Sequence, residues 1–195
     1  MSKVAFFNNP KIVRRWVQAL CCAPFLAAAQ TAFALDGMSL EYGTSNSTNA
    51  DVKLVRLSAQ WNWNERWFDR GDWFVRGYWE ASIAAWENNS LLKTNSGLID
   101  IGYIPVLRFQ QRVPSAIAPY IEGGSGLHWL FKTSVSTERD FGSHYQFGSH
   151  VGAGVRFGEK HKYDLSYRYQ HISNAGFKQP NQGINFNLLR FGYNF

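Results

Sequence analysis

From residue 38 onward, apolar and polar residues alternate with a period of two, as they do along β-strands that have one apolar and one polar face. In the clearest segment, Tyr163, Leu165, Tyr167 and Tyr169 share the apolar face, and Arg168 lies on the opposite face. Most of the alternating segments are about 9–14 residues long, a length that suits tilted membrane-spanning strands. The pattern predicts eight strands, at residues 38–43, 55–63, 73–83, 99–108, 117–129, 145–157, 163–173 and 185–195.

The polar faces of these strands carry charged residues again and again. A soluble barrel or sandwich places apolar residues inside, whereas a membrane barrel turns its apolar faces to lipid and its polar faces to the lumen. Aromatic residues also gather near strand ends, where the two membrane interfaces would lie. We therefore predict an all-β fold, an eight-stranded antiparallel transmembrane β-barrel of the bacterial outer membrane, with a soluble barrel as the weaker alternative. A barrel of this size is filled by its own side chains, so its internal charges should form a paired network rather than a transport path.

The first 34 residues differ from the rest of the chain. They hold four basic residues and no acid, then an apolar run that ends in Ala32-Phe33-Ala34, a small-x-small cleavage pattern. We expect residues 1–34 to be a cleaved signal peptide and residues 35–195 to be the barrel domain. Both cysteines lie in this segment, so no disulfide and no thiolate metal site is expected in the mature chain. The mature charge is 16 basic minus 14 acidic residues, about +2, which gives no reason to expect nucleic-acid binding.

An even number of strands places both ends of the barrel domain on one side of the membrane. The last strand ends at Phe195, on the apolar face that also holds Phe191 and Tyr193. This ending resembles the C-terminal signature that the barrel-assembly machinery reads in outer-membrane proteins. With that end in the periplasm, the loops at residues 44–50, 87–96, 132–142 and 174–183 should be external.

Two polar residues interrupt the apolar face at the outer end of the seventh predicted strand. His171 and Ser173 are two positions apart, so their Cβ atoms should lie about 6–7 Å apart on one face. A serine nucleophile needs a base, and the base needs a third group that fixes its tautomer. Asn185 begins the same face of the next strand and could meet His171 across the hairpin. The alternative is that His171 and Ser173 are merely polar residues at the headgroup level.

The run from His171 through Ser173-Asn174-Ala175-Gly176 to Ile184 resembles the signature of the lipid A 3-O-deacylases, an outer-membrane family also described as acyloxyacyl hydrolase-like. The resemblance implies an eight-stranded barrel with a site on its outer wall, near the outer leaflet. It implies hydrolysis of the ester-linked 3-hydroxyacyl chain at position 3 of lipid A, without metal or cofactor. Carried over, Ser173 is the nucleophile, His171 the general base, and Asn174 with backbone N–H groups near Gly176 a candidate oxyanion stabiliser.

The chain departs from the family pattern at Asn185, where the family has glutamate. A neutral amide can orient the imidazole but cannot offset imidazolium charge, so a slower or more alkaline enzyme, or an inactive one, is expected. The arrangement also resembles outer-membrane phospholipase A, which leaves a phospholipase-like esterase open beside a non-catalytic structural barrel. Lys178 and Arg139 lie in predicted outer loops and could meet lipid A phosphates, although solvated loop charge is the simpler interpretation. A homodimer is also left open.

Overall fold

The computed structural model describes residues 35–47, 50–69, 71–112 and 116–195, and the predicted signal peptide lies outside these ranges. Residues 36–195 form one compact unit. Its elements are β1 (Gly37–Ser45), β2 (Val52–Trp67), β3 (Trp73–Asn88), β4 (Gly97–Gln111), β5 (Ile117–Leu130), β6 (Ser134–Ser136), β7 (Arg139–Asp140), β8 (Tyr145–Phe157), a short 3₁₀ helix (Glu159–His161), β9 (Tyr163–Ser173) and β10 (Ile184–Asn194).

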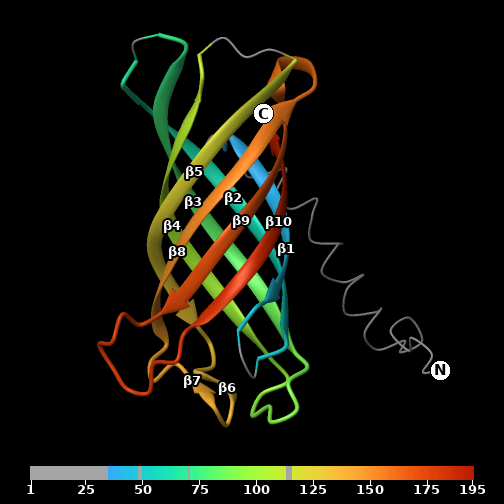
Figure 1. The fold of residues 1–195 in the computed structure, drawn as a ribbon, viewed down its shortest axis with the longest axis vertical. Helices are drawn as coiled ribbons and strands as arrows, with labels where there is room; N and C mark the ends of the chain where they lie inside the picture. The colour runs from blue at the N-terminus through green and yellow to red at the C-terminus, as the bar shows by residue number, and fades with distance from the viewer. Residues whose placement is uncertain (1–34, 48–49, 70, 113–115) are drawn as a thin grey trace, which may run out of the picture. The chain divides into compact units, whose positions relative to one another are not determined.

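Eight of these strands close into a barrel in the order β1-β10-β9-β8-β5-β4-β3-β2. Neighbouring strands are antiparallel, and β1 closes the ring by pairing with β10. Figure 1 shows the strands tilted along the wall, with the C-terminus at one end and the β9–β10 loop at the other. The predicted eight-stranded antiparallel barrel is confirmed. No helix in the described ranges is both long and apolar enough to cross a membrane.

Several strand ends and one loop differ from the sequence prediction. The second strand, predicted to end at residue 63, continues to Trp67 after a register irregularity between Asn62 and Arg66, and the third, predicted to end at residue 83, continues to Asn88. The loop at residues 132–142 contains the small β6–β7 hairpin, which is drawn at the lower end of Figure 1. β6 has three residues and β7 has two, which is too short for an alternation of apolar and polar residues to be recognised in the sequence.

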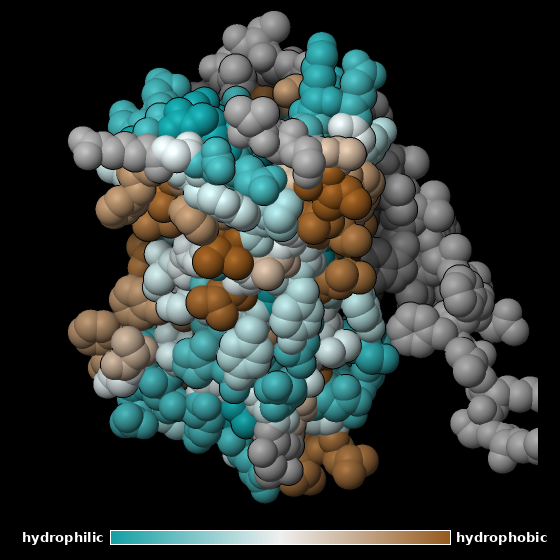
Figure 2. Space-filling view, turned by 45° about the horizontal axis from the view of Figure 1, so that its top comes forward, coloured by the Kyte–Doolittle hydropathy of each residue, from teal (hydrophilic) through white to brown (hydrophobic). Residues whose placement is uncertain are grey.

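The apolar faces point outward, as expected for a membrane barrel. Tyr167 and Tyr169 are 52% and 38% exposed, while Arg168 between them is 1% exposed. Figure 2 shows apolar residues on the flanks of the barrel and hydrophilic residues gathered toward the upper rim. The outer wall is therefore built for hydrocarbon, and the lumen holds the charges.

The lumen contains a paired ionic network across much of its length, as predicted. Arg168 Nη1 lies 2.7 Å from Glu41 Oε1 and 2.9 Å from Glu80 Oε1, and Arg168 Nε lies 2.7 Å from Glu122 Oε1. Arg108 pairs with two acids as well, since its Nη2 lies 2.8 Å from Glu122 Oε2 and its Nη1 lies 3.0 Å from Asp164 Oδ2. Because each charge in this network has partners on several strands, the network links strands that are not neighbours in the sheet.

At the end of the barrel near the β9–β10 loop, the lumen changes from ionic to apolar. A cluster of buried apolar residues fills it, including Leu54, Trp86, Phe141, Ile172 and Ile184. Ile172 and Ile184 are directly opposed across β9 and β10. This apolar core anchors the strand ends that carry the candidate site.

Candidate active site

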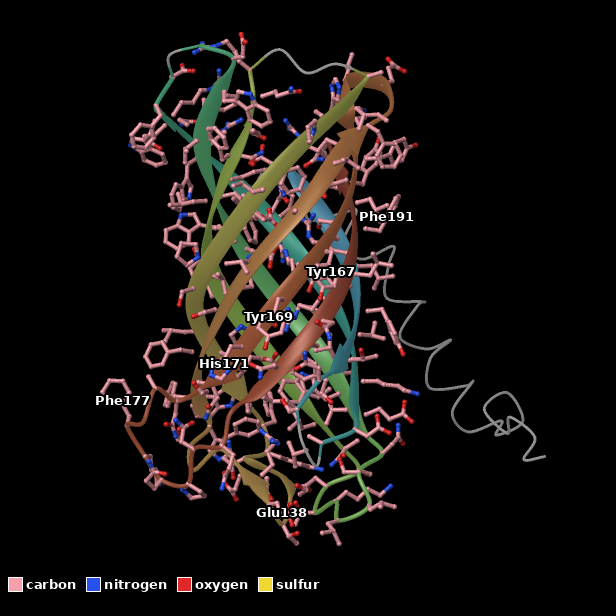
Figure 3. All side chains as sticks on the ribbon, viewed as in Figure 1. Glu138, Tyr167, Tyr169, His171, Phe177 and Phe191 are labelled. Atoms are coloured by element: carbon pink, nitrogen blue, oxygen red, sulfur yellow. The ribbon has the colours of Figure 1, made fainter. Side chains whose placement is uncertain are left out.

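The packing of the apolar core decides which side chains face outward at the ends of β9 and β10. Ile172 and Ile184 are fully buried inside the barrel. Since side chains alternate along a strand, His171, Ser173 and Asn185 must then point to the outer wall. In the antiparallel register, His171 lies directly opposite Asn185. Figure 3 shows His171 on the same wall as Tyr167 and Tyr169, close to the loop that carries Phe177.

The three side chains form one hydrogen-bonded chain. His171 Nδ1 lies 2.6 Å from Asn185 Oδ1, and His171 Nε2 lies 3.0 Å from Ser173 Oγ. The asparagine Oδ1 can only accept, so the proton of a neutral imidazole sits on Nδ1. Nε2 is then an acceptor for the Ser173 hydroxyl. This is the tautomer that a general base next to a serine nucleophile requires.

The β1–β2 loop holds the backbone of Asn185 in place. The Asn185 N–H donates to Ser47 Oγ at 2.9 Å, and the Asn185 carbonyl accepts from the Asn46 N–H at 3.1 Å. Sequence reasoning missed Ser47, which is 138 residues away from Asn185 and carries no local signal. Its contact follows from the closure of the barrel, which brings β1 beside β10.

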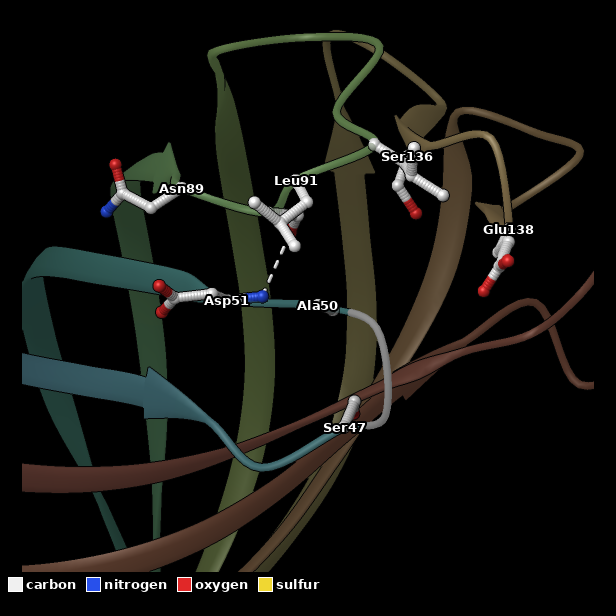
Figure 4. A pocket seen from close by; sticks show the side chains of 9 residues that line it. Ser47, Ala50, Asp51, Asn89, Leu91, Ser136 and Glu138 are labelled. Carbon is white, nitrogen blue, oxygen red and sulfur yellow. Dashed lines mark hydrogen bonds between the residues drawn. The ribbon is translucent and has the colours of Figure 1, made fainter.

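The same loop also lines a cavity of about 570 Å³ at this end of the barrel (Figure 4). Its walls come from the β1–β2 loop, the β3–β4 loop and the β6–β7 hairpin. Within it, the Asp51 N–H donates to Ser90 Oγ at 2.9 Å, the bond drawn as a dashed line. The loops at this end of the barrel thus brace one another next to the apolar core.

Asn174 organises the loop that follows the serine. Its side chain is 2% exposed, and its Nδ2 donates to the carbonyls of Phe141 and Lys178, each at 2.6 Å. Its Oδ1 accepts from the Gly176 N–H at 3.0 Å. Ala175 and Gly176 both have positive φ, 54° and 81°, which turns the chain sharply away from the wall. Asn174 and Gly176, the oxyanion donors expected from the sequence, thus follow Ser173 in the chain, and their hydrogens are directed at acceptors in the protein.

The two loop cations that we singled out from the sequence behave differently. The Lys178 side chain is exposed, as expected for a solvated loop charge. Arg139 instead donates to the carbonyls of Gln182, at 3.2 Å, and Gly183. Partial burial lowers the pKa of the Arg139 guanidinium from its usual value. Arg139 ties the β6–β7 hairpin to the segment just before β10.

Apolar side chains surround the polar cluster. Phe147 lies opposite Ser173 across β8 and β9, and its ring centroid is 5.9 Å from that of Phe177. Tyr169 and Leu189 continue the exposed apolar surface along the wall. No group of three or more metal-ligating side chains is found among the described residues. The cluster is thus a hydroxyl, an imidazole and an amide set in a surface suited to a lipid.

Comparison with known proteins assigns the chain to a family. Residues 53–194 match the family model described as Lipid A 3-O-deacylase (PagL). The chain belongs to this family. It is 33% identical over 138 residues to the lipid A deacylase PagL of Pseudomonas aeruginosa, an alignment that covers 71% of this chain and 76% of the relative. A PagL from Bordetella bronchiseptica is 41% identical over 76 residues, or 39% of this chain and 41% of that protein.

A solved structure agrees with this membership. The crystal structure of the outer membrane enzyme PagL superposes with a TM-score of 0.72 at 28% identity, over 82% of this chain and 99% of that one. The protein is therefore an outer-membrane β-barrel of a lipid A 3-O-deacylase family, whose relatives are hydrolases of lipid A. The resemblance stated from the His171–Ile184 signature is confirmed at the level of the family.

Proposed function

We propose that this protein is a serine esterase that removes the ester-linked 3-hydroxyacyl chain at position 3 of lipid A. Family membership supports the substrate class. The observation that carries the chemistry is the position of His171, whose two ring nitrogens lie 2.6 Å from Asn185 Oδ1 and 3.0 Å from Ser173 Oγ. The lipid-facing setting of the cluster suits an ester that stays within a membrane.

In the proposed reaction, Ser173 Oγ attacks the acyl carbonyl carbon while its proton passes to His171 Nε2. Asn185 Oδ1 keeps accepting from the Nδ1–H and so keeps the ring oriented as it becomes an imidazolium. Collapse of the tetrahedral intermediate breaks the bond to the sugar oxygen, which takes the proton from Nε2. A water then hydrolyses the acyl-enzyme with the same base and releases the fatty acid.

Asn174 and Gly176 are our candidates for stabilising the oxyanion. Their hydrogens are now bonded to Phe141, Lys178 and Asn174 itself, so substrate must draw at least one of them away from its present acceptor. A shift in the 174–183 loop when lipid A binds would do this. The exposed Lys178 side chain lies in the same loop and is our candidate for contact with a lipid A phosphate.

We further propose that the site faces the outer leaflet. His171 and Ser173 lie at the barrel end that carries the longer loops, opposite the end where the chain closes at Asn194. Lipid A occupies the outer leaflet of the outer membrane, so this orientation brings enzyme and substrate together. Recognition of Phe195 by the barrel-assembly machinery and a homodimer remain predictions from the sequence.

The second candidate function is that of a phospholipase-like esterase, and Asn185 in the third position is the observation that favours it. Mixed vesicles of lipid A and phospholipid, incubated with the protein and analysed by mass spectrometry, separate the two. Loss of one 3-hydroxyacyl chain from lipid A supports the deacylase, and it must disappear in Ser173→Ala and His171→Ala.

A matched control is Ser125→Ala, which removes another hydroxyl from the lipid-facing wall and should leave the reaction unchanged. Release of fatty acid from phospholipid alone would favour the phospholipase. If both lipids stayed intact in correctly folded protein, the barrel would be non-catalytic.

A further inference from the structure

A second polar site lies at the opposite end of the barrel from the catalytic cluster. A cavity of about 130 Å³ opens there, between residues that flank β1 and β10 and residues near the start of β3 and the end of β8. Tyr78 and Arg108 lie on its lumen side. Arg108 is already paired with Glu122 and Asp164, at 2.8 and 3.0 Å. The ionic network of the lumen therefore ends just below the cavity.

Cations that the network does not neutralise surround this cavity. Arg76, Arg156 and Lys160 all line it, and Asp36 is the only side-chain carboxylate among the lining residues. Asp36 Oδ2 accepts from the Asn62 N–H at 2.7 Å. Counting only side chains outside the network, the lining has three cations and one carboxylate, an excess of positive charge even before His161 is considered.

Arg156 shows the imbalance most clearly. Within the described ranges, no hydrogen bond and no ion pair joins its guanidinium to another residue, and its Nε is shielded from solvent. Its cross-strand neighbour is Asp164, whose carboxylate is occupied by Arg108 and Arg190. A shielded donor without an acceptor is costly, and such groups often mark a missing ligand.

Arg76 and Gln110 add further unused hydrogen-bonding capacity. Arg76 Nε donates to the Trp63 carbonyl at 2.7 Å, and no carboxylate that the structure describes lies within ion-pair distance of it. Gln110 is 6% exposed and lines the cavity, and its Oε1 has no partner there. Since an amide can turn either end toward a ligand, Gln110 can complete the coordination of an anion.

We propose that this cavity binds a phosphate group. Two guanidinium groups can each present a fork of N–H donors to the oxygens of a tetrahedral anion, and the Lys160 ammonium adds a point charge. The volume is about four times the share of one water in the liquid, which admits a phosphate but not a nucleotide. The phosphate can be free or part of a lipid headgroup, because the cavity lies at the barrel rim, next to Phe195.

The test uses the purified protein in a non-ionic detergent and measures its thermal unfolding midpoint. Inorganic phosphate should raise the midpoint in proportion to the logarithm of its concentration once binding saturates, and chloride at equal ionic strength should not. Short-chain phosphatidylglycerol added to the micelles, with phosphatidylcholine as reference, gives the lipid arm. If phosphatidylglycerol raises the midpoint and inorganic phosphate does not, the site binds a lipid headgroup. If phosphatidylglycerol and inorganic phosphate both raise it, the site binds the phosphate group as such.

Matched variants locate the binding. Arg156→Gln combined with Lys160→Gln should weaken phosphate binding at least tenfold, whereas Lys93→Gln combined with Lys132→Gln removes the same charge at the other end and should change nothing. Lys160→Glu changes one exposed side chain, so it remains informative if the double variant fails to fold, and it should also abolish the response. A wild-type midpoint that ignores both phosphate and phosphatidylglycerol would overturn the proposal. So would equal responses in wild type and Lys160→Glu, or an equal response to acetate.

Discussion

Arg168 and His171 lie three positions apart on strand β9, but they face opposite sides of the barrel wall. Arg168 points inward and pairs with Glu41, Glu80 and Glu122, which come from three other strands. His171 points outward and has two partners, both at the wall. The inner network is redundant and shielded from water, so it cross-links the barrel. The outer cluster is a single chain of three groups, so the proposed mechanism needs each link, and we expect the fold to need none of them.

The largest effect that this comparison predicts is on catalysis. Ser173→Ala should lower the rate of lipid A deacylation by roughly 10³–10⁶-fold, as removal of a serine nucleophile does elsewhere. Its free energy of unfolding should change by less than about 0.5 kcal/mol, because the residue lies on the surface. Deacylation assays and denaturant unfolding on the same preparation check both halves. A variant that unfolds easily would show that the outer cluster also supports the barrel.

A substitution in the inner network should lower the stability of the barrel and leave its activity unchanged, the reverse of what we expect for Ser173→Ala. Arg168→Met leaves three buried carboxylates without their shared cation and should lower the free energy of unfolding by about 3–5 kcal/mol. Specific activity of the folded fraction should be retained. The matched control is Arg112→Met, which breaks the exposed pair with Asp69 at 2.6 Å and should cost at most about 1 kcal/mol. Urea unfolding in lipid vesicles measures the difference, and similar losses in both variants would contradict the account.

The Asn185→Glu variant tests how the third residue of the cluster acts on His171. A carboxylate at this position stabilises the imidazolium, so the reaction should speed up above the acid limb of the pH–rate profile. Because the base must be neutral, the acid limb itself should move to higher pH, by about one unit. The native protein should then keep its activity at lower pH than the variant. The sequence alone led us to expect a more alkaline profile for the native protein, and the pH–rate measurement decides between the two. A pH–rate profile identical to wild type would count against the triad assignment.

The smallest effect that we predict is a loss of stability from a hydrogen bond on the outer wall, at Tyr167. Tyr167 Oη donates to Asn187 Oδ1 at 2.6 Å on the exposed face. Tyr167→Phe removes this bond and should cost about 0.5–1.5 kcal/mol, with activity unchanged. Unfolding midpoints measure the loss. A drop in activity without a loss of stability would extend the catalytic cluster toward the membrane core.

The sequence sufficed for the barrel and for the cluster because both follow from alternation. Each strand shows its two faces directly, and the His171–Asn185 pair needs only the hairpin that joins adjacent strands. The contact of Ser47 with Asn185 could not be predicted, since it depends on closure between the first and last strands. The same is true of Arg139 and of the β6–β7 hairpin, whose partners lie in loops with no periodic pattern.

The central claim is that one hydroxyl on the outer wall is activated by one imidazole. A serine-directed phosphonate ester with a short acyl-like chain tests it directly, with peptide mass spectrometry to locate the adduct. We predict a single adduct on Ser173 that is lost in His171→Ala and retained in Ser125→Ala. An adduct on another residue, or deacylation of lipid A by protein in which Ser173 cannot be labelled, would contradict the account.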